Sequence, residues 1–280
     1  IDKILEEGKA KLDSFLATDV DREVLYGRFE GYRSFAEAYN CPLDGNGGLA
    51  SDRPYELAPH RTLRFIGLNT ALICSANDKK EEGHLLLGAR QHVLPRNSGE
   101  ELVVLAHHPL HWLRDSAETL QYLRSRARVF ISGHEHNPSL EIEQVKPDSD
   151  LMKLAVGATV PPRVSEGYTY TYNLLVFDWD SDSDGLRVTV VPRAWSPADT
   201  EFVEDNVRLG ESTPTFVLGC PNFKRKALDP LKSVYEQPVS NADLVDLLSE
   251  ESDAVSGAIE QEESPVQEAF ALLLLRFFRG

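Results

Sequence analysis

The run of residues 101–132 constrains the fold of this chain more than any other segment. It begins with the apolar stretch ELVVLA (101–106), continues with the helical pattern SAETLQYLRSR (116–126) and ends with ARVFIS (127–132). A strand, a helix and a strand in this order form a βαβ unit, whose two strands are parallel and usually adjacent. The chain is therefore predicted to be an α/β (α+β) protein in which both strands end at one edge of a sheet, where such sheets bind ligands.

Histidines lie directly beyond both of these strands. His107 and His108 follow the first strand, and Gly133 separates the second strand from His134 and His136. Residues two apart on an extended chain point the same way, so His134 and His136 are expected to face one side. By the same alternation, only one of His107 and His108 can join them. Gly133 is expected to let the backbone turn. Three converging imidazoles are typical of a transition-metal site.

An alternative explanation applies to each motif taken alone. A histidine at the end of a strand is usually a hydrogen-bonded polar residue without a metal. The presence of both motifs at neighbouring strand ends favours metal binding. Other histidines of the chain have no such neighbours, and we assign them to the surface or to structural roles: His60, His84, His92 and His111.

The two histidine motifs also carry a family resemblance. VVLAHHPL (103–110) followed by VFISGHEH (129–136) resembles the last two metal-binding motifs of the calcineurin-like metallophosphoesterases. The segment LRFIGLNTALI (63–73), the helix with Gln91 and the hairpin YNLLVFDWDSDSDGLRVTVVPRAW lie where that family has its later elements. By motif order the resemblance covers residues 50–195.

The resemblance implies a metallophosphoesterase-type β-sandwich flanked by helices. It also implies two divalent metal ions, with Mn, Fe, Zn and Ni all open, that promote hydrolysis of phosphomonoesters or phosphodiesters. Carried over to this sequence, His107 and His134 would bind one ion and His136 the other. His108 would assist catalysis either by contacting the metal-binding residues or by facing the substrate, and the alternative is that it is a purely structural histidine.

The chain departs from the family pattern in its first half. The motifs D-x-H, G-D-x-x-D and G-N-H-[DE] are absent; Gly45-Asn46 is not followed by histidine, and Asp19 and Asp21 are expected to begin a helix. Neutral imidazoles do not balance two divalent cations, so carboxylate ligands are needed as well. Since the sequence begins at Ile1, we expect the missing motifs and the N-terminal strands of the domain to lie upstream.

Composition and periodicity suggest three parts. Residues 1–49 are predicted to be a helical leading segment or insertion, with two helices up to about residue 39 and a loop from residue 41 to 54. Residues 50–196 would be the C-terminal portion of the metallophosphoesterase domain. Residues 197–280 would be an acidic C-terminal extension, with helices expected at 241–251 and 264–279. The last helix has a broad apolar face that could pack on the core, a second copy or another partner.

Charge and cysteine content limit the partners. The chain has 29 Lys+Arg and 45 Asp+Glu, which gives a net charge of −16. Such a chain repels nucleic acid, so a phosphate-ester substrate such as a nucleotide is favoured over DNA or RNA. The three cysteines are odd in number and form no C-x-x-C pair, so they indicate neither a disulfide framework nor a zinc finger and suit a reducing cytoplasm. No apolar run is long enough to span a membrane.

Three functions are therefore considered from the sequence. The first is a metal-dependent phosphoesterase, supported by the paired histidine motifs. The second is a metallophosphoesterase-like binding or scaffold protein that is catalytically incomplete, suggested by the absent acidic motifs. The third is a DNA-processing nuclease, which the negative charge disfavours.

Overall fold

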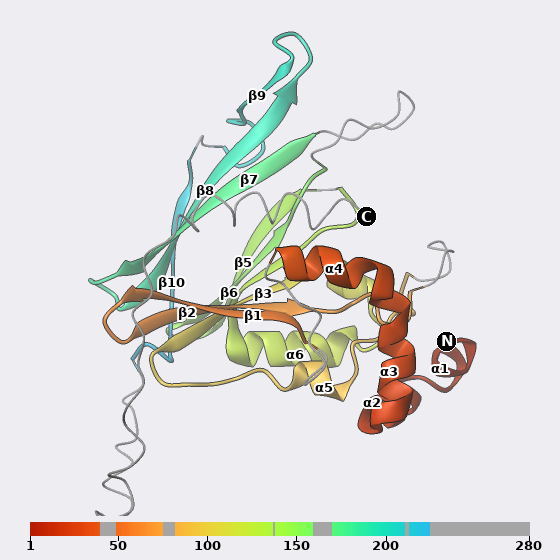
Figure 1. The fold of residues 1–280 in the computed structure, drawn as a ribbon. Coiled ribbons are helices and arrows are strands. Elements are labelled where there is room, and N and C mark those ends of the chain that lie inside the picture. The colour runs from red at the N-terminus through yellow and green to blue at the C-terminus, as the bar shows by residue number, and fades with distance from the viewer. Residues whose placement is uncertain (40–48, 75–81, 137, 159–169, 211–212, 225–280) are drawn as a thin grey trace, which may run out of the picture.

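The computed structural model describes residues 1–39, 49–74, 82–136, 138–158, 170–210 and 213–224 (Figure 1). The helices are α1 (Asp2–Glu7), α2 (Lys9–Ala17), α3 (Asp19–Tyr26), η1 (Gly27–Phe29), α4 (Glu30–Ala38), α5 (Ala89–His92), η3 (Leu110–Trp112) and α6 (Ser116–Arg126). The strands are β1 (Leu49–Ala58), β2 (Arg61–Leu68), β3 (Glu100–Ala106), β4 (Ala127–Ser132), β5 (Ser139–Lys146), β6 (Ser149–Ala155), β7 (Thr171–Asp180), β8 (Gly185–Ser196), β9 (Glu201–Glu204) and β10 (Thr215–Leu218).

The larger sheet contains the βαβ unit predicted from the sequence. Its six strands have the order β1-β2-β3-β4-β6-β5. The four central strands are parallel, while the edge strands β1 and β5 run antiparallel to their neighbours. Strands β3 and β4 pair directly, from Leu102 opposite Ala127 to Ala106 opposite Ser132, and α6 connects them. The predicted parallel and adjacent arrangement of these strands is confirmed.

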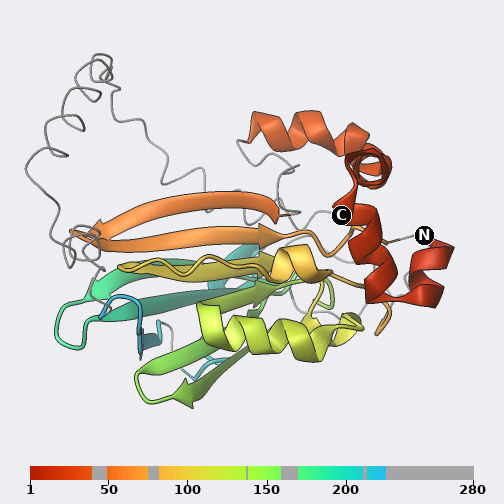
Figure 2. The same cartoon turned by 90° about the horizontal axis from the view of Figure 1, so that it is seen from below.

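A second sheet packs on one face of the first. It has the order β10-β8-β7, and β9 pairs with β8. Alternation along the central strands divides the core. Val103 and Val129 pack against Val188 of the second sheet, whereas Val104 and Phe130 face the helical side. Figure 2 shows α6 covering the larger sheet on the face opposite β7 and β8. The predicted mixed α/β class with helices flanking two packed sheets is observed.

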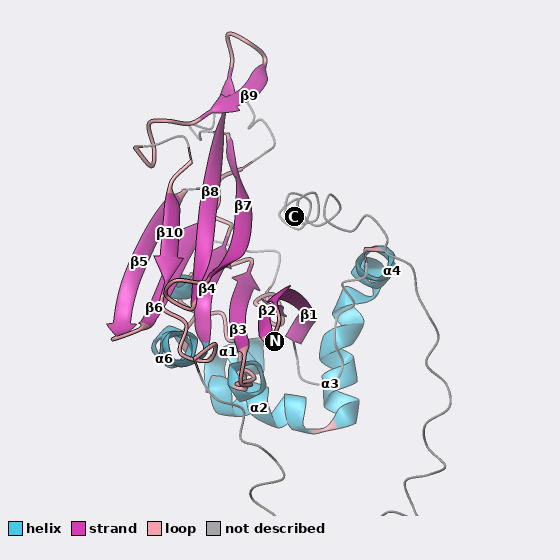
Figure 3. Cartoon of the chain, turned by 90° about the vertical axis from the view of Figure 1, so that its left-hand side faces the viewer, coloured by secondary structure: helices cyan, strands magenta, loops and turns pink. Residues whose placement is uncertain are grey.

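The leading segment forms more helices than the two expected up to residue 39. Four α-helices and a 3-10 turn occupy this stretch (Figure 3). Gly8 has a φ of 79° and ends α1, and the Thr18 hydroxyl accepts a hydrogen bond from the Asp21 amide at 3.4 Å and caps α3. Leu12 and Leu16 are buried in the core on the helical side. Local capping therefore divides what hydrophobic spacing alone suggested to be two continuous helices.

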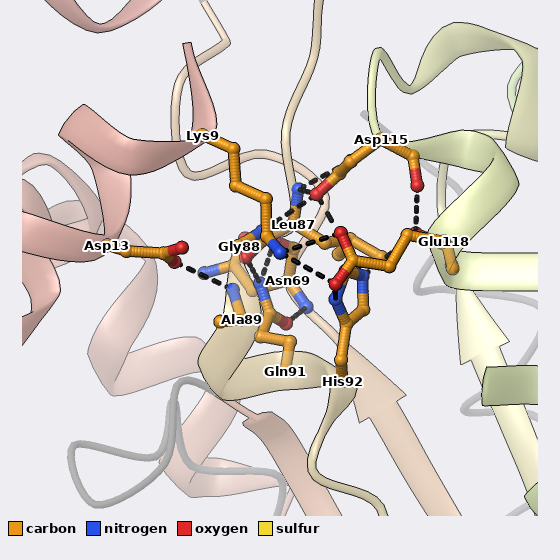
Figure 4. Close-up of polar contacts among 11 residues, drawn as sticks. Lys9, Asp13, Asn69, Leu87, Gly88, Ala89, Gln91, His92, Asp115 and Glu118 are labelled. Atoms are coloured by element: carbon orange, nitrogen blue, oxygen red, sulfur yellow. Dashed lines mark hydrogen bonds and ion pairs between the residues drawn. The ribbon is translucent and has the colours of Figure 1, made fainter. Parts of the chain in front are cut away.

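Polar contacts also dock the leading helices. The Lys9 ammonium lies 2.6 and 2.7 Å from the two Glu118 oxygens of α6, and the Arg114 guanidinium donates to the Leu5 carbonyl at 3.0 Å. Asp13 accepts a hydrogen bond from the Ala89 amide at the start of α5 at 2.7 Å (Figure 4). The helices thus contact both α5 and α6, the two elements that flank the strand ends described below.

Other expectations about the flanking segments were wrong in part. Residues 49–54 were expected to be loop but belong to β1, which forms a hairpin with β2. Strands β9 and β10 lie within 197–224, where no strand was expected; both are four residues long and gain their hydrogen bonds by pairing with β8. The helices expected at 241–251 and 264–279, together with Gly45, Asn46 and Cys41, lie outside the described residues. Within the described part, no helix is long and apolar enough to cross a membrane.

A buried ion pair near the starts of β3 and β4 is also bonded to the end of the described chain. Arg128 of β4 and Glu101 of β3 are both fully buried, with Nε and Oε2 3.2 Å apart. The guanidinium also donates to the Ser149 hydroxyl at 2.7 Å, and Glu101 accepts from the Asn222 amide at 2.7 Å. Burial raises the pKa of the Glu101 carboxyl to about 7, although Arg128 and Asn222 act to lower it.

Gly99, which precedes β3, provides a test of the close backbone packing at this end of the sheet. Its φ is 73°, and an added Cβ would lie 2.6 Å from the His60 carbonyl oxygen. We expect Gly99→Ala to destabilise the chain by about 2 kcal/mol or more, measured by urea denaturation. Gly31→Ala is the control, because a Cβ there meets no atom within 4 Å in helix α4. The control is expected to be neutral or stabilising by about 0.5–1 kcal/mol; equal effects of the two substitutions would contradict the prediction.

Candidate metal centre

Three histidines meet at the carboxyl ends of β3 and β4. One ring nitrogen each of His107, His108 and His134 lies within 4.8 Å of the other two. His134 Nδ1 is 3.1 Å from His107 Nε2. The Gly133 amide donates to the His107 carbonyl at 3.0 Å, which continues the pairing of the two strands past their ends. The sequence prediction that distant histidines meet at this edge is therefore confirmed for His107 and His134.

The prediction of which histidines point together was wrong. Both His107 and His108 join the cluster, whereas alternation allowed only one of them. The reason is that β3 ends at Ala106 and β4 ends at Ser132, so the alternation of extended chain does not apply beyond them. His136 is not in the cluster, and its proposed binding of a second ion stays a prediction.

At this site the positive backbone φ angles occur at histidines and not at the glycine. His134 has a φ of 74° and His136 has a φ of 56°, whereas Gly133, which was expected to provide the turn, does not have a positive φ. A positive φ costs a non-glycine residue free energy, and such residues are concentrated at functional sites. The chain after β4 therefore leaves the extended conformation at both histidines, and this sets the directions of their side chains.

His108 is the most enclosed member of the cluster. Its side chain is buried, its Nδ1 lies 2.8 Å from the Thr70 hydroxyl, and its ring stacks on Trp112 with centroids 5.6 Å apart. Burial, together with the neighbouring His107 and His134, lowers the pKa of His108 to about 3. The imidazole is therefore neutral at pH 7, the form that coordinates a metal ion.

Trp112 and Glu135 border the cluster on one side. The Trp112 ring lies edge-on to His134 with centroids 4.2 Å apart, and its indole N–H donates to a Glu135 oxygen at 2.9 Å. The same oxygen accepts a hydrogen bond from His111 Nε2 at 2.5 Å. His111 is half exposed, so this histidine, which we assigned to the surface, is on the rim of the centre. Glu135 therefore binds the rings of Trp112 and His111 at the edge of the cluster and is not itself a member of the histidine group.

Sequence reasoning missed Thr70 and its neighbours. Strand β2 is parallel to β3 and ends at Leu68, so Asn69 and Thr70 emerge at the same edge as the histidines. Gln91 of α5 holds Asn69 from both sides, since its Oε1 accepts from the Asn69 amide at 2.7 Å and its Nε2 donates to the Asn69 carbonyl at 2.9 Å. The polar pair Asn69-Thr70 directly after an apolar strand was visible in the sequence. It could be assigned to the histidine site only once β2 was known to lie beside β3.

The donor set fits one transition-metal ion. Three imidazoles with a remaining open position are a known ligand set for catalytic zinc, and imidazole also suits Fe and Ni. Among the described residues, the group contains no carboxylate. Because two divalent ions need anionic ligands, the histidine cluster by itself satisfies one ion.

Comparison with known proteins gives no independent assignment. No protein-family model matches the chain, and a search of curated proteins finds no match.

Proposed function

We propose that this chain is a metal-dependent phosphoesterase that hydrolyses phosphomonoesters or phosphodiesters. The observation that carries the proposal is the convergence of His107, His108 and His134 at the carboxyl ends of adjacent parallel strands. The reaction class comes from the resemblance of the two histidine motifs to those of calcineurin-like metallophosphoesterases. The two packed sheets with flanking helices are compatible with the metallophosphoesterase-type sandwich that this resemblance implies.

Each residue of the site has a proposed role. His107, His108 and His134 would hold one divalent ion, and His136 would contribute to a second. When bound, such ions polarise the phosphoryl group and neutralise its charge. Trp112 packs edge-on against His134 and would exclude water from that side of the cluster, while Glu135 holds the exposed His111 at the rim through its Nε2. A phosphate ester, nucleotides included, is the proposed substrate class.

A binding function without catalysis is the second candidate. The described residues provide no carboxylate in the histidine group, and a dinuclear centre would need such ligands. A chain that binds one ion, and positions it without the ligands for a second, could act as a scaffold or a metal-binding module. The two candidates share the metal site and differ in whether phosphate esters are hydrolysed.

A metal-removal experiment tests the proposal. The chain would be treated with a chelator, dialysed and titrated with Zn²⁺ and Mn²⁺ by calorimetry, and then assayed with p-nitrophenyl phosphate and bis(p-nitrophenyl) phosphate. We expect stoichiometric binding and hydrolysis that requires the added ion. Tight binding without hydrolysis of either ester would support the scaffold function. A chain that binds neither ion would overturn both candidates.

A further inference from the structure

Thr70 contacts His108 through two separate groups. Its hydroxyl oxygen lies 2.8 Å from His108 Nδ1 and accepts a hydrogen bond from the His108 backbone amide at 3.3 Å. Both residues are buried, so neither contact is exchanged with bulk water. A hydroxyl oxygen has two lone pairs and can accept from both N–H groups at once. Thr70 therefore fixes both the backbone and the ring of this histidine.

We propose that Thr70 is a positioning residue that sets the tautomer of His108. In this arrangement His108 carries its ring proton on Nδ1, donates it to Thr70, and keeps the Nε2 lone pair for a metal ion. This inference rests on the proposed metal site and deepens it, since it identifies the group that makes His108 a ligand. Histidine ligands commonly donate their second ring N–H to a fixed acceptor, which sets ring orientation and raises ligand basicity.

The opposite tautomer has a specific alternative partner. Cys74 Sγ lies 3.9 Å from His108 Nε2, and sulfur is a weak acceptor. A proton on Nε2 would therefore have only a long contact to sulfur, whereas a proton on Nδ1 has the Thr70 oxygen at 2.8 Å. The shorter contact to the better acceptor favours the Nδ1–H form.

Gln91 makes the position of Thr70 rigid. It is buried, and it binds the backbone of Asn69, next to Thr70, through both the amide and the carbonyl. It also donates to the Leu87 carbonyl at 3.0 Å. The Leu87 and Gly88 amides in turn donate to Asp115 ahead of α6, as Figure 4 shows. The turn that carries Thr70 is thus tied to α5 and α6, and its hydroxyl has little freedom to leave His108.

The chain provides a matched control. Thr119 is buried, and its hydroxyl lies 2.9 Å from Nε2 of the buried His92, away from the cluster. Thr70→Val and Thr119→Val both replace a buried hydroxyl by a methyl group beside a histidine, so they share any general loss of stability. Thr70→Ser keeps the hydroxyl and serves as the conservative variant.

The experiment measures metal affinity and ring protonation. Zn²⁺ affinity of the four proteins would be measured by competition with a chromogenic chelator, and the ring nitrogens of His108 by ¹⁵N NMR of the metal-free chain, assigned with His108→Asn. We expect Thr70→Val to weaken Zn²⁺ binding about 10- to 100-fold. Thr70→Ser should bind within about threefold of the unaltered chain and Thr119→Val equally well. His108 should carry its proton on Nδ1 in the unaltered chain.

Several results would overturn this inference. They are unchanged affinity in Thr70→Val, an equal loss in Thr119→Val, no recovery in Thr70→Ser, or a proton on Nε2 in the unaltered chain. If the unaltered chain bound no Zn²⁺, the proposed function would fail together with this inference. Binding by the unaltered chain with no effect of Thr70→Val would remove the inference alone.

Discussion

Replacing His134 by alanine is expected to lower the affinity of the chain for Zn²⁺ at least about 100-fold, or about 2.7 kcal/mol. His134 is one of three histidines in the cluster, and its Nδ1 lies 3.1 Å from His107 Nε2. Removal of one ligand leaves two imidazoles, which cannot complete a tetrahedral site without additional water. Metal-dependent hydrolysis of phosphate esters should be lost in parallel.

The backbone at His134 requires a second variant. Its φ of 74° is unfavourable for alanine, so His134→Ala could lose affinity through local rearrangement. Asparagine tolerates a positive φ, and His134→Asn removes the imidazole without that cost. We expect both variants to lose affinity to a similar extent.

His60→Asn is the matched control for the loss of a histidine. His60 also has a positive φ, 61°, but it precedes β2 and so lies at the opposite end of that strand from the cluster. Its substitution should leave Zn²⁺ affinity unchanged in the same titration. If His134→Asn bound Zn²⁺ as tightly as the control, the cluster would not be the metal site.

The second large effect concerns stability. Arg128→Met is expected to destabilise the chain by about 3–5 kcal/mol, measured by urea denaturation at neutral pH. The substitution leaves the fully buried Glu101 without its cation and the Ser149 hydroxyl without its donor. Methionine fills most of the volume, so the loss should reflect the unpaired polar groups more than a cavity.

The double variant Glu101→Gln/Arg128→Met separates the ion pair from the other contacts. Glutamine keeps an oxygen that can accept from the Asn222 amide, but it carries no charge. Because removal of both charges avoids an uncompensated buried ion, the double variant should be destabilised by less than the sum of the single variants. Additive effects of the two substitutions would contradict a coupled pair.

The destabilisation caused by Arg128→Met should also depend on pH. The pKa of Glu101 is raised from 4.5 to about 7 in the folded chain, so the folded state binds more protons than the unfolded state between these values. Stability from this group therefore falls as pH rises towards 7 and is constant above it. Without the guanidinium the pKa rises further, and the fall continues above pH 7 by about 1.4 kcal/mol per pH unit. Arg128→Met should accordingly be more destabilising at about pH 8 than at about pH 6.

Some features of this protein could be predicted from local sequence patterns. The limits of β4 and α6 agree with the predicted segments 127–132 and 116–126, and β3 differs by one residue at its start. The pairing of β3 with β4 followed from the short strand-helix-strand spacing. Because hydrophobic periodicity and connection length are properties of neighbouring residues, they are present in the sequence before any long-range contact forms.

The sequence by itself determined the mixed α/β class and the edge where His107 and His134 meet. The tertiary structure decided that His108 joins them, that Thr70 arrives from β2, and that Arg128 meets Glu101 inside the sheet. It also decided β10, whose four residues become a strand by pairing with β8. These features depend on strand order and on backbone turns beyond the strand ends, where side-chain alternation no longer applies and contacts join residues far apart in the chain.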